Sequence, residues 1–541
     1  MPGIVPDRLS HVAGPTAPPL SEATVAETLA ATVAARPGAV AAVFPGLRWT
    51  WAELAAEVDA LARGLLSLGI GRGDRVGIWS PNRPEWLLTQ FATARIGAIL
   101  VTVNPAYRTA ELRFALRKTG CAAVVLAPGF KGSDYAAMLE EVRPDLPDLR
   151  HPIVMGEGFE ALMAVGRGRG DDLDAIRLSN ADPINIQFTS GTTGTPKGAT
   201  LTHRNIVNNA RSVMAAQGLG AGDRLCIPVP FYHCFGMVMG TLGCAATGCA
   251  MAVPGEGFDP LATLRAIEKE RCTSLYAVPT MFVAMLEHPE FASFDLSSLR
   301  TGIMAGAPCP TAVMRRVMRD MHMAGVTIAY GMTETAPVSF QSALDTPLEK
   351  RVGSVGRVQP HVEVKLVGAD GALVPVGEQG EILTRGYSVM EGYWDEPGLT
   401  AEAVVDGWMR TGDLGRLDAE GYLSITGRRT DMVIRGGENV YPREIEEALD
   451  ALPGISQSQV FGLPDARLGE VVCAWVMAAP GAEVTAEGVR EALSGRIAHY
   501  KVPSLVRVVD EWPMTVTGKP QKFQMRAAMV EELGLEEAET A

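Results

Sequence analysis

The chain has 541 residues, of which 47% are hydrophobic, and its 48 basic and 62 acidic residues give a net charge of −14. This composition is typical of a large globular protein of about three to four domain-sized units. The acidic balance argues against a nucleic-acid-binding protein, which usually carries a basic face. The 8 cysteines include no Cys-x-x-Cys pair, so we expect buried free thiols and no zinc site or disulfide framework.

The N-terminal 20 residues lack the charged-then-apolar pattern of a signal peptide and are typical of a Pro/Gly-rich arm. The uncharged stretch 235–253 is long enough to cross a bilayer. Its glycines make it only modestly apolar, however, so we expect a buried helix that runs into a buried strand. Together these features predict a cytoplasmic protein without a transmembrane segment.

Helical and strand-like patterns alternate from about residue 24 onward. Apolar spacing predicts a helix within 49–70 and a short strand within 72–80. The same order recurs in 110–127 and in 259–279. A helix, a short link and an apolar run in repeated order indicate an α/β fold.

After about residue 350 the alternation of helix and strand patterns gives way to short strand patterns. Segments 362–368, 380–386 and 415–426 are short strands separated by Gly or Asp turns, which predicts a small β-barrel-like part. From about residue 430 the chain predicts two helices, 442–452 and 485–500, with strands between them and a last helix after a loop. We therefore expect a large N-terminal domain of α/β subdomains, residues 1–429, and a mobile small α+β C-terminal domain, residues 430–541.

The string TSGTTGTPKG, residues 189–198, combines hydroxyl residues and glycines ahead of a lysine. A Walker loop needs a glycine directly before its lysine and a hydroxyl residue after it, and here Pro196 precedes Lys197. The physical inputs are still those of a phosphate site, because successive backbone N–H groups and hydroxyls can donate to phosphate oxygens. A surface loop of turn residues is the alternative interpretation of the string by itself.

The longer string QFTSGTTGTPKGATLTHRN resembles the phosphate loop of the adenylate-forming superfamily, which includes acyl- and aryl-CoA synthetases, adenylation domains and beetle luciferases. The resemblance continues in order over nearly all of the chain after residue 180. The motifs that carry it are PFYHCFG (230–236), AGAP (305–308), AYGMTET (329–335), RTGDLG (410–415), GRRTDMVIRGGENVYPREIEE (427–447), HYKVP (499–503) and PMTVTGK (513–519).

The resemblance implies ATP, Mg²⁺ and the co-substrate CoA as ligands. Glu334 matches the family's Mg²⁺-binding glutamate, Tyr330 the residue that stacks on adenine, and Asp413 and Arg428 the two ribose contacts. The residues that match ATP-binding positions are Thr189, Ser190, Gly191, Thr192, Thr193, Gly194, Thr195, Pro196, Lys197, Gly306, Ala307, Pro308, Tyr330, Gly331, Met332, Thr333, Asp413 and Arg428.

Lys519 matches the lysine that assists adenylation in the family, where a cation offsets the charge that builds at the α-phosphate. The matching CoA-binding residues are Arg435, Gly436, Gly437 and Glu438. The family's small domain turns between its two half-reactions about a hinge that is commonly Asp or Lys. Here the hinge position is Thr430, which leaves the rate of domain rotation open.

The acyl pocket is expected near Tyr232 and His233, where relatives place a residue beside the acid, and near Gly240, whose small size would leave room for an apolar tail. The residues expected to act in catalysis are Lys519, Glu334, Thr189 and His233. The role of His233 is in the pocket and not that of a general base, because a carboxylic acid is already ionised near neutral pH. A packed core histidine is the alternative interpretation of His233.

PFYHCFG contains no acidic residue, whereas amino-acid-activating relatives carry an aspartate there for the α-amino group. The strings NPAYRTAEL (104–112) and TRGYSVMEGYW (384–394) look most like the medium-chain fatty acyl-CoA synthetase branch. We therefore expect an ATP-dependent acid–CoA ligase that forms acyl-CoA, AMP and pyrophosphate through an acyl-adenylate. Aryl acids and short or unusual acids remain open as substrates.

Three other classes share the ATP-binding motifs. They are a luciferase-like oxygenase, an enzyme that transfers the acyl group to a carrier protein, and a non-enzymatic ATP-binding paralogue. Retention of Lys519, Glu334 and Asp413 together argues against the paralogue. The expected partners are a small carboxylic acid, ATP and CoA, with no nucleic acid, and the resemblance is also compatible with a homodimer.

Overall fold

The computed structural model describes residues 8–189, 196–307, 309–435, 438–465, 467–494, 496–515 and 519–535. The chain divides into two compact units. The larger unit comprises residues 12–364 and 383–410, and the smaller one residues 1–11, 365–382 and 411–541. The chain passes from one unit into the other within strands β1 (His11–Ala13), β19 (Val362–Val367), β20 (Gln379–Gly386) and β23 (Trp408–Leu417). The domain boundary at residue 430 stays a prediction.

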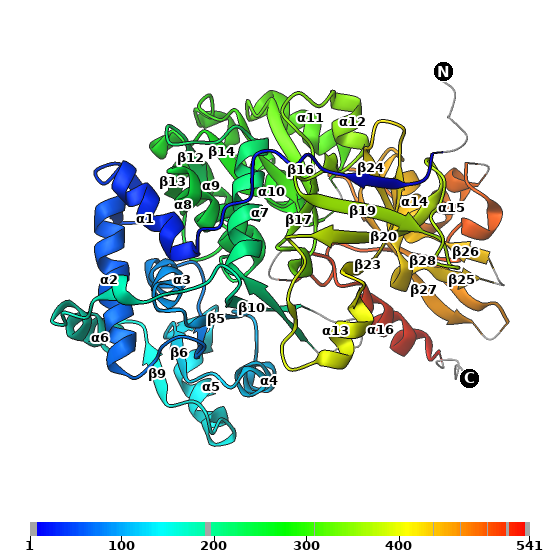
Figure 1. The fold of residues 1–541 in the computed structure, drawn as a ribbon. Helices are drawn as coiled ribbons and strands as arrows, with labels where there is room; N and C mark the ends of the chain where they lie inside the picture. The colour runs from blue at the N-terminus through cyan, green and yellow to red at the C-terminus, as the bar shows by residue number, and fades with distance from the viewer. Residues whose placement is uncertain are drawn as a thin grey trace. The chain divides into compact units, whose positions relative to one another are not determined.

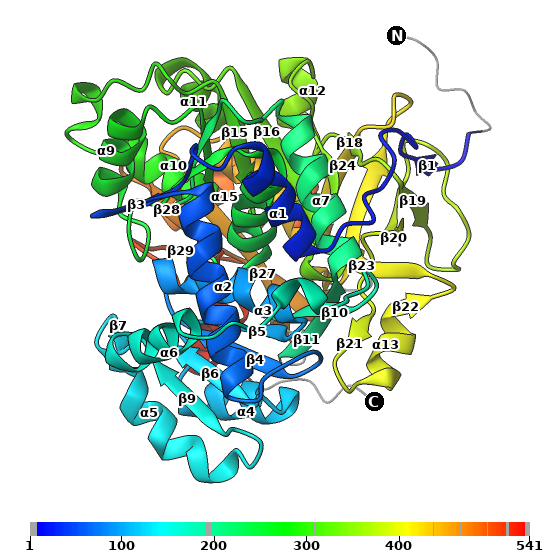
Figure 2. The same cartoon turned by 60° about the vertical axis from the view of Figure 1, so that its left-hand side comes forward.

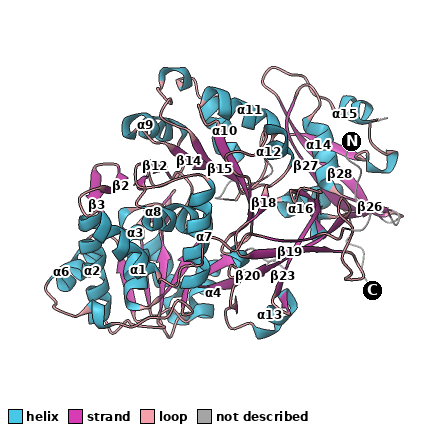
Figure 3. Cartoon of the chain, turned by 45° about the horizontal axis from the view of Figure 1, so that its top comes forward, coloured by secondary structure: helices cyan, strands magenta, loops and turns pink. Residues whose placement is uncertain are grey.

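The larger unit contains a nine-stranded sheet whose central strands are parallel and whose outer strands are antiparallel. Helices α9 (Pro260–Glu270), α10 (Pro279–Leu286) and α11 (Thr311–Asp320) border this sheet (Figure 3). In sheet order the strands are β18 (Arg357–Val358), β17 (Val338–Gln341), β16 (Gly325–Gly331), β15 (Thr301–Ala305), β14 (Ser274–Ala277), β12 (Arg224–Cys226), β13 (Ala250–Ala252), β2 (Val40–Phe44) and β3 (Leu47–Thr50).

A seven-stranded sheet belongs to the same unit. Its order is β21 (Gly392–Tyr393), β11 (Lys197–Thr202), β10 (Pro183–Thr189), β5 (Ile99–Val103), β4 (Arg75–Trp79), β6 (Ala123–Leu126) and β9 (His151–Val154). Strands β5 and β6 are buried at every position, which explains why neither alternates between apolar and charged residues. Three shorter strands of this unit are β7 (Gly129–Phe130), β8 (Ser133–Asp134) and β22 (Val404–Val405).

The helices of the larger unit cover both sheets, and α1 packs against α2, α3, α7 and α8 (Figures 1 and 2). They are α1 (Val25–Ala35), α2 (Trp51–Ser67), α3 (Pro84–Ile96), α4 (Thr109–Thr119), α5 (Tyr135–Val142), α6 (Glu157–Arg167), α7 (His203–Ala216), α8 (Gly243–Thr247), α9 (Pro260–Glu270), α10 (Pro279–Leu286), α11 (Thr311–Asp320), α12 (Leu348–Gly353) and α13 (Pro397–Ala403).

Local sequence explains where several of these helices begin. At α2, the Thr50 hydroxyl accepts the Glu53 N–H at 3.2 Å, and Glu53 accepts the Thr50 N–H at 2.7 Å, which closes a capping box. The predicted helices within 49–70, 110–120 and 259–272 are confirmed as α2, α4 and α9. The α/β fold class is confirmed with them.

The smaller unit contains a sheet in the order β26 (Glu438–Val440), β25 (Val433–Arg435), β28 (Gly469–Ala478) and β27 (Ile455–Asp465). Strand β29 (Leu505–Val508) pairs with β28, and β24 (Leu423–Arg428) pairs with β23. The helices of this unit are α14 (Pro442–Asp450), α15 (Ala486–Leu493) and α16 (Lys522–Leu533). The helix predicted over 485–500 therefore ends early, because Ser494 adopts an extended conformation before the short 3₁₀ turn η7 (His499–Lys501).

The strands of the smaller unit alternate between two apolar clusters. Val460 and Val472 pack with Ile445 and Leu449 of α14, whereas Phe461 and Trp475 pack with Met525 and Met529 of α16. Successive strand residues point to opposite faces of a sheet. Helices α14 and α16 therefore cover opposite faces of the β27–β28 pair (Figure 1).

The uncharged stretch 235–253 forms a buried helix that leads into a buried strand, as predicted. It begins as a π-helix, η3 (Phe235–Leu242), continues as α8 and ends in β13. Among the described residues, no helix combines the length and the apolar character needed to span a lipid bilayer. All eight cysteines have free thiols, and seven of them are buried.

Candidate active site

Strands β10 and β11 deliver the two ends of the predicted phosphate loop. They pair antiparallel, and Thr189 at the end of β10 lies opposite Lys197 at the start of β11. The pairing holds both ends of the loop 189–197 together. The predicted residues Ser190, Gly191, Thr192, Thr193, Gly194 and Thr195 lie outside the described residues.

Glu334 lies beside this loop end in the 3₁₀ turn η5 (Thr333–Thr335), and it is buried. Its Oε1 accepts hydrogen bonds from the Tyr393 hydroxyl at 2.9 Å and from the Thr189 hydroxyl at 3.2 Å. The backbone carbonyl of Glu334 accepts the Met390 N–H at 2.9 Å. Thr189 and Glu334, which are 145 residues apart in the sequence, are thus brought into direct contact.

Tyr393 is a member of this cluster that the sequence interpretation did not single out. It lies on the two-residue strand β21, opposite Ala199 of β11, and its ring is 5.3 Å from the Lys197 ammonium. Burial, followed by the nearby charge of Glu334, raises the pKa of the Tyr393 phenol, so the hydroxyl stays protonated and donates. The signal in the sequence was the tyrosine of the Gly-Tyr-Trp triplet, 392–394, near the end of the TRGYSVMEGYW string.

The predicted adenine-binding residues lie at the carboxyl ends of two neighbouring parallel strands. Gly306 and Ala307 follow β15, while Tyr330 and Gly331 end β16, and Ala305 lies opposite Ala329. Ligands in open α/β sheets bind at this edge. A Cβ at Gly331 would lie 1.8 Å from the Pro337 carbonyl oxygen, so only glycine fits there. Pro308 lies outside the described residues.

Asp413 and Arg428 belong to the smaller unit and form an ion pair. They face each other across the β23–β24 ladder, and the Arg428 Nε lies 2.8 Å from the Asp413 Oδ1. The Asp413 side chain is buried, whereas 61% of the Arg428 side chain is exposed. The two residues predicted to contact one ribose are therefore adjacent.

The backbone of Lys519 is hydrogen-bonded to Thr515 ahead of α16, and these two residues are called the Lys519 turn below. The Lys519 carbonyl oxygen accepts the Thr515 N–H at 2.7 Å, and the Lys519 N–H donates to the Thr515 hydroxyl at 2.9 Å.

In the predicted CoA-binding segment, Arg435 and Glu438 face each other across the β25–β26 hairpin. Gly436 and Gly437 lie outside the described residues, and the hinge role of Thr430 stays a prediction.

Tyr232 and His233 precede the π-helix η3 and are half-buried. The His233 carbonyl oxygen accepts the N–H groups of Gly236 and Met237, each at 3.0 Å, so His233 forms part of the helix start. Its Nδ1 accepts the Phe235 N–H at 3.2 Å. This arrangement fixes the ring of His233 at the beginning of the buried helix.

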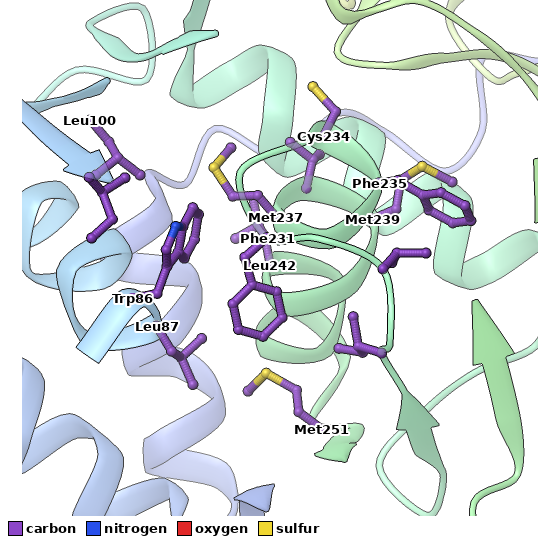
Figure 4. Close-up of a cluster of buried hydrophobic side chains, with 14 of the residues drawn as sticks. Trp86, Leu87, Leu100, Phe231, Cys234, Phe235, Met237, Met239, Leu242 and Met251 are labelled. Carbon is purple, nitrogen blue, oxygen red and sulfur yellow. The ribbon is translucent and has the colours of Figure 1, made fainter. Parts of the chain in front are cut away.

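The helix η3 is surrounded by large apolar side chains. Trp86 and Phe231 lie beside its own Met237 (Figure 4), and the rings of Trp86 and Phe231 are 5.4 Å apart. A Cβ at Gly240 would lie 3.3 Å from the side chain of Ile227, so this glycine packs on Ile227 in the present structure. The environment is apolar, and Gly240 as an acyl-pocket residue stays a prediction.

The Thr189–Glu334 contact lies within the larger unit, and the Asp413–Arg428 ion pair lies within the smaller one. The AMP-binding enzyme family matches residues 29–394, and the AMP-binding enzyme C-terminal domain matches residues 444–519.

Relatives resemble the chain over nearly its whole length. The putative acyl-CoA synthetase YngI of Bacillus subtilis (strain 168) is 43% identical, covering 95% of this chain and 99% of its own. The mitochondrial medium-chain acyl-CoA ligase ACSF2 of Danio rerio is 45% identical, covering 97% of this chain and 91% of its own. The crystal structure of ATP-bound MatB from Rhodopseudomonas palustris superposes with a TM-score of 0.84 at 30% identity, covering 95% of this chain and 100% of that one.

The chain belongs to the AMP-binding enzyme family. It is an acyl-CoA synthetase, an AMP-forming acid–CoA ligase, as the motifs predicted.

Proposed function

We propose that this ligase activates medium-chain fatty acids in two half-reactions. In the first, a carboxylate oxygen of the acid attacks the α-phosphorus of ATP and pyrophosphate leaves. In the second, the sulfur of CoA attacks the acyl carbon and AMP leaves. The observation that supports this proposal best is the contact of Thr189 and Tyr393 with the buried carboxylate of Glu334 at the end of the phosphate-loop strand.

Glu334 is assigned to Mg²⁺. Among the described residues, the hydrogen bonds that its carboxylate accepts, from Thr189 and Tyr393, both fall on Oε1. Mg²⁺ binds oxygen ligands, usually through one or two carboxylates together with substrate phosphates, and the ion would offset the charge of the triphosphate. The Thr189 hydroxyl and the Lys197 ammonium belong to the two ends of the loop, where they would donate hydrogen bonds to phosphate oxygens.

The nucleoside of ATP is assigned to two groups of residues. Gly306, Ala307 and Tyr330 would border adenine, and their place at the carboxyl ends of β15 and β16 supports this role. Asp413 would accept hydrogen bonds from the ribose hydroxyls. Its ion pair with Arg428 holds the second predicted ribose contact beside it.

Lys519 is assigned to the adenylation step, in which its ammonium would offset the negative charge that develops on the α-phosphate. Arg435 and Glu438, with Gly436 and Gly437, are assigned to CoA in the thioester-forming step. Alternation of the C-terminal domain about Thr430 between these two steps is part of the proposal.

The acid is assigned to the region of Tyr232, His233 and η3. Residues 225–255 contain no acidic side chain, which disfavours an amino-acid substrate. The apolar side chains around η3 suit an alkyl chain, whose burial is favourable in proportion to its apolar area. Relatives named medium-chain acyl-CoA ligase support the same substrate class. A cytoplasmic location and a homodimer stay predictions.

The test is AMP release by the purified enzyme with ATP and Mg²⁺, with and without CoA. The acids to compare are the straight-chain series from acetate to palmitate, together with benzoate and cinnamate. The proposal predicts CoA-dependent AMP release that peaks among acids of intermediate length. A peak at benzoate or cinnamate would replace the medium-chain assignment with an aryl-acid ligase. AMP release that does not depend on free CoA would indicate a carrier-protein acceptor.

A further inference from the structure

Helix α14 carries two carboxylates, Glu444 and Glu446, that reach different parts of the smaller unit. Residues two positions apart in an α-helix are separated by about 200° around the helix axis. The two side chains therefore leave α14 on nearly opposite sides. Each makes an ion pair with a lysine far away in the sequence, Lys501 for Glu444 and Lys522 for Glu446.

Glu446 connects the two faces of the sheet at its edge. It is a buried carboxylate whose Oε1 accepts the Lys522 ammonium at 2.5 Å and the Val460 N–H at 2.9 Å. Val460 lies on β27, the last strand of its sheet, where outward N–H groups lack a strand partner. Lys522 is the first residue of α16, which covers the other face. Glu446 thus accepts a hydrogen bond from an N–H at the sheet edge and also binds Lys522 at the start of α16.

The start of α16 is also the base of the Lys519 turn. Lys522 follows Lys519 by three residues, and the intervening Gln521 donates its N–H to the Pro513 carbonyl at 2.9 Å. Thr515 and Lys519 close the turn with their reciprocal hydrogen bonds. Since both ends of this turn are fixed to the same short segment, displacement of Lys522 would displace Lys519.

Glu444 makes the corresponding connection to the CoA-side segment. Both of its oxygens lie 2.7 Å from the Lys501 ammonium. The neighbouring residue, Tyr500, accepts a 2.5 Å hydrogen bond on its carbonyl oxygen from Arg435 Nη1. Arg435 in turn faces Glu438 across the β25–β26 hairpin. The chain of contacts therefore runs from α14 through η7 to the hairpin assigned to CoA.

We propose that α14 holds one positioning residue for each half-reaction: Glu446 orients the Lys519 turn for adenylation, and Glu444 orients the Arg435 hairpin for thioester formation. This inference rests on the proposed function, which assigns Lys519 and Arg435 to different steps. Neither glutamate contacts a substrate, and each acts through the lysine that it holds.

The experiment measures the two half-reactions separately in Glu446→Gln and Glu444→Gln. Adenylation is followed as pyrophosphate release from ATP and octanoate without CoA. Thioester formation is followed from synthetic octanoyl-adenylate and CoA. Glutamine at 446 retains an oxygen for the Val460 N–H while losing the charge that holds Lys522, so the fold is disturbed little. Lys522→Gln removes the same ion pair from the partly exposed side and serves as the second variant.

Glu447→Gln is the matched control. Glu447 lies on the same helix and pairs at 2.7 Å with Arg443 of α14 itself, so its ion pair reaches neither the Lys519 turn nor the Arg435 hairpin. We expect the control to leave both half-reactions within about twofold of the wild type, as is usual for exposed helix pairs.

We expect Glu446→Gln and Lys522→Gln to slow adenylation roughly tenfold while leaving thioester formation nearly unchanged, since small displacements of a catalytic group are costly. Glu444→Gln should show the reverse. If either glutamate variant slows both half-reactions by the same factor, or neither, the positioning roles are wrong. Lys519→Ala separates this failure from failure of the proposed function. If wild type forms no acyl-adenylate, or Lys519→Ala retains adenylation, the proposed function itself falls and the inference falls with it.

Discussion

The hydroxyl of Tyr393 donates a 2.9 Å hydrogen bond to Glu334, and the ring of the same tyrosine lies 5.3 Å from the ammonium of Lys197. One side chain thus contacts both the proposed Mg²⁺ ligand and the lysine at the end of the phosphate loop. The hydroxyl contact with Glu334 and the ring contact with Lys197 can be tested separately, because Tyr393→Phe removes the hydroxyl and keeps the ring.

Tyr393→Phe should therefore weaken the Mg²⁺-dependent binding of ATP. A hydrogen bond to a charged group contributes about 1.5–3 kcal/mol, so we expect activity to fall roughly tenfold or more. Calorimetric titration of ATP at several Mg²⁺ concentrations should show that more Mg²⁺ is needed for half-maximal binding. Tyr387→Phe is the control, since Tyr387 is a buried tyrosine whose hydroxyl meets Asn209. An unchanged Mg²⁺ requirement in Tyr393→Phe would argue against the role of its hydroxyl.

The Asp413–Arg428 pair gives a second prediction, for the ribose. Asp413→Asn keeps the size of the side chain but removes its charge, so the hydrogen bonds that it accepts become weaker. We expect the KM for ATP to rise roughly tenfold, with the KM for the fatty acid unchanged. Steady-state kinetics with each substrate varied in turn distinguishes the two. An equal rise in both KM values would indicate a general disturbance of the site instead.

The start of the π-helix predicts a contrast between two glycines. A Cβ at Gly236 would lie 2.3 Å from the Pro230 carbonyl oxygen, whereas one at Gly240 would meet Ile227 side-chain atoms at 3.3 Å and the Phe235 carbonyl oxygen at 3.5 Å. Gly236→Ala should destabilise the protein by roughly 1–3 kcal/mol because backbone must move. Gly240→Ala should stay within about 1 kcal/mol of the wild type. The midpoints of urea denaturation measure both, and equal midpoints for the two variants would contradict the packing described for η3.

His203 makes stability depend on pH. It is fully buried, its Nδ1 accepts the Val25 N–H at 3.0 Å, and burial lowers its pKa to about 4 from the usual 6.5. Since the folded pKa lies below the unfolded one, the stability that neutral His203 contributes is present above pH 6.5 and is lost as pH falls toward 4.

Wild type should thus lose roughly 2 kcal/mol through this group between pH 7 and pH 5. His203→Gln retains an acceptor for the Val25 N–H but does not titrate, so its urea midpoint should fall less over the same interval. Parallel losses in the two proteins would mean that His203 is not the titrating group.

The Asp413–Arg428 and Thr189–Glu334 contacts join residues that the sequence motifs had already singled out. Those motifs are local strings with strong chemical character, and the α/β alternation around them followed from apolar spacing. Tyr393 was missed because a tyrosine in a two-residue strand has no periodic signal, and its role depends on two partners that are distant in the sequence. The π-helix was expected only as a helix, since no residue pattern distinguishes its wider hydrogen bonding. Lys522 and Glu446 are 76 residues apart, so their contact required the fold.

The role of Lys519 in adenylation is tested most directly by the effect of Lys519→Ala on the two half-reactions. Pyrophosphate release from ATP and a medium-chain fatty acid should fall roughly a hundredfold or more, as for other electrostatic groups at a developing charge. Thioester formation from supplied acyl-adenylate and CoA should continue at a rate close to that of the wild type. Adenylation at the wild-type rate in Lys519→Ala would contradict the central assignment.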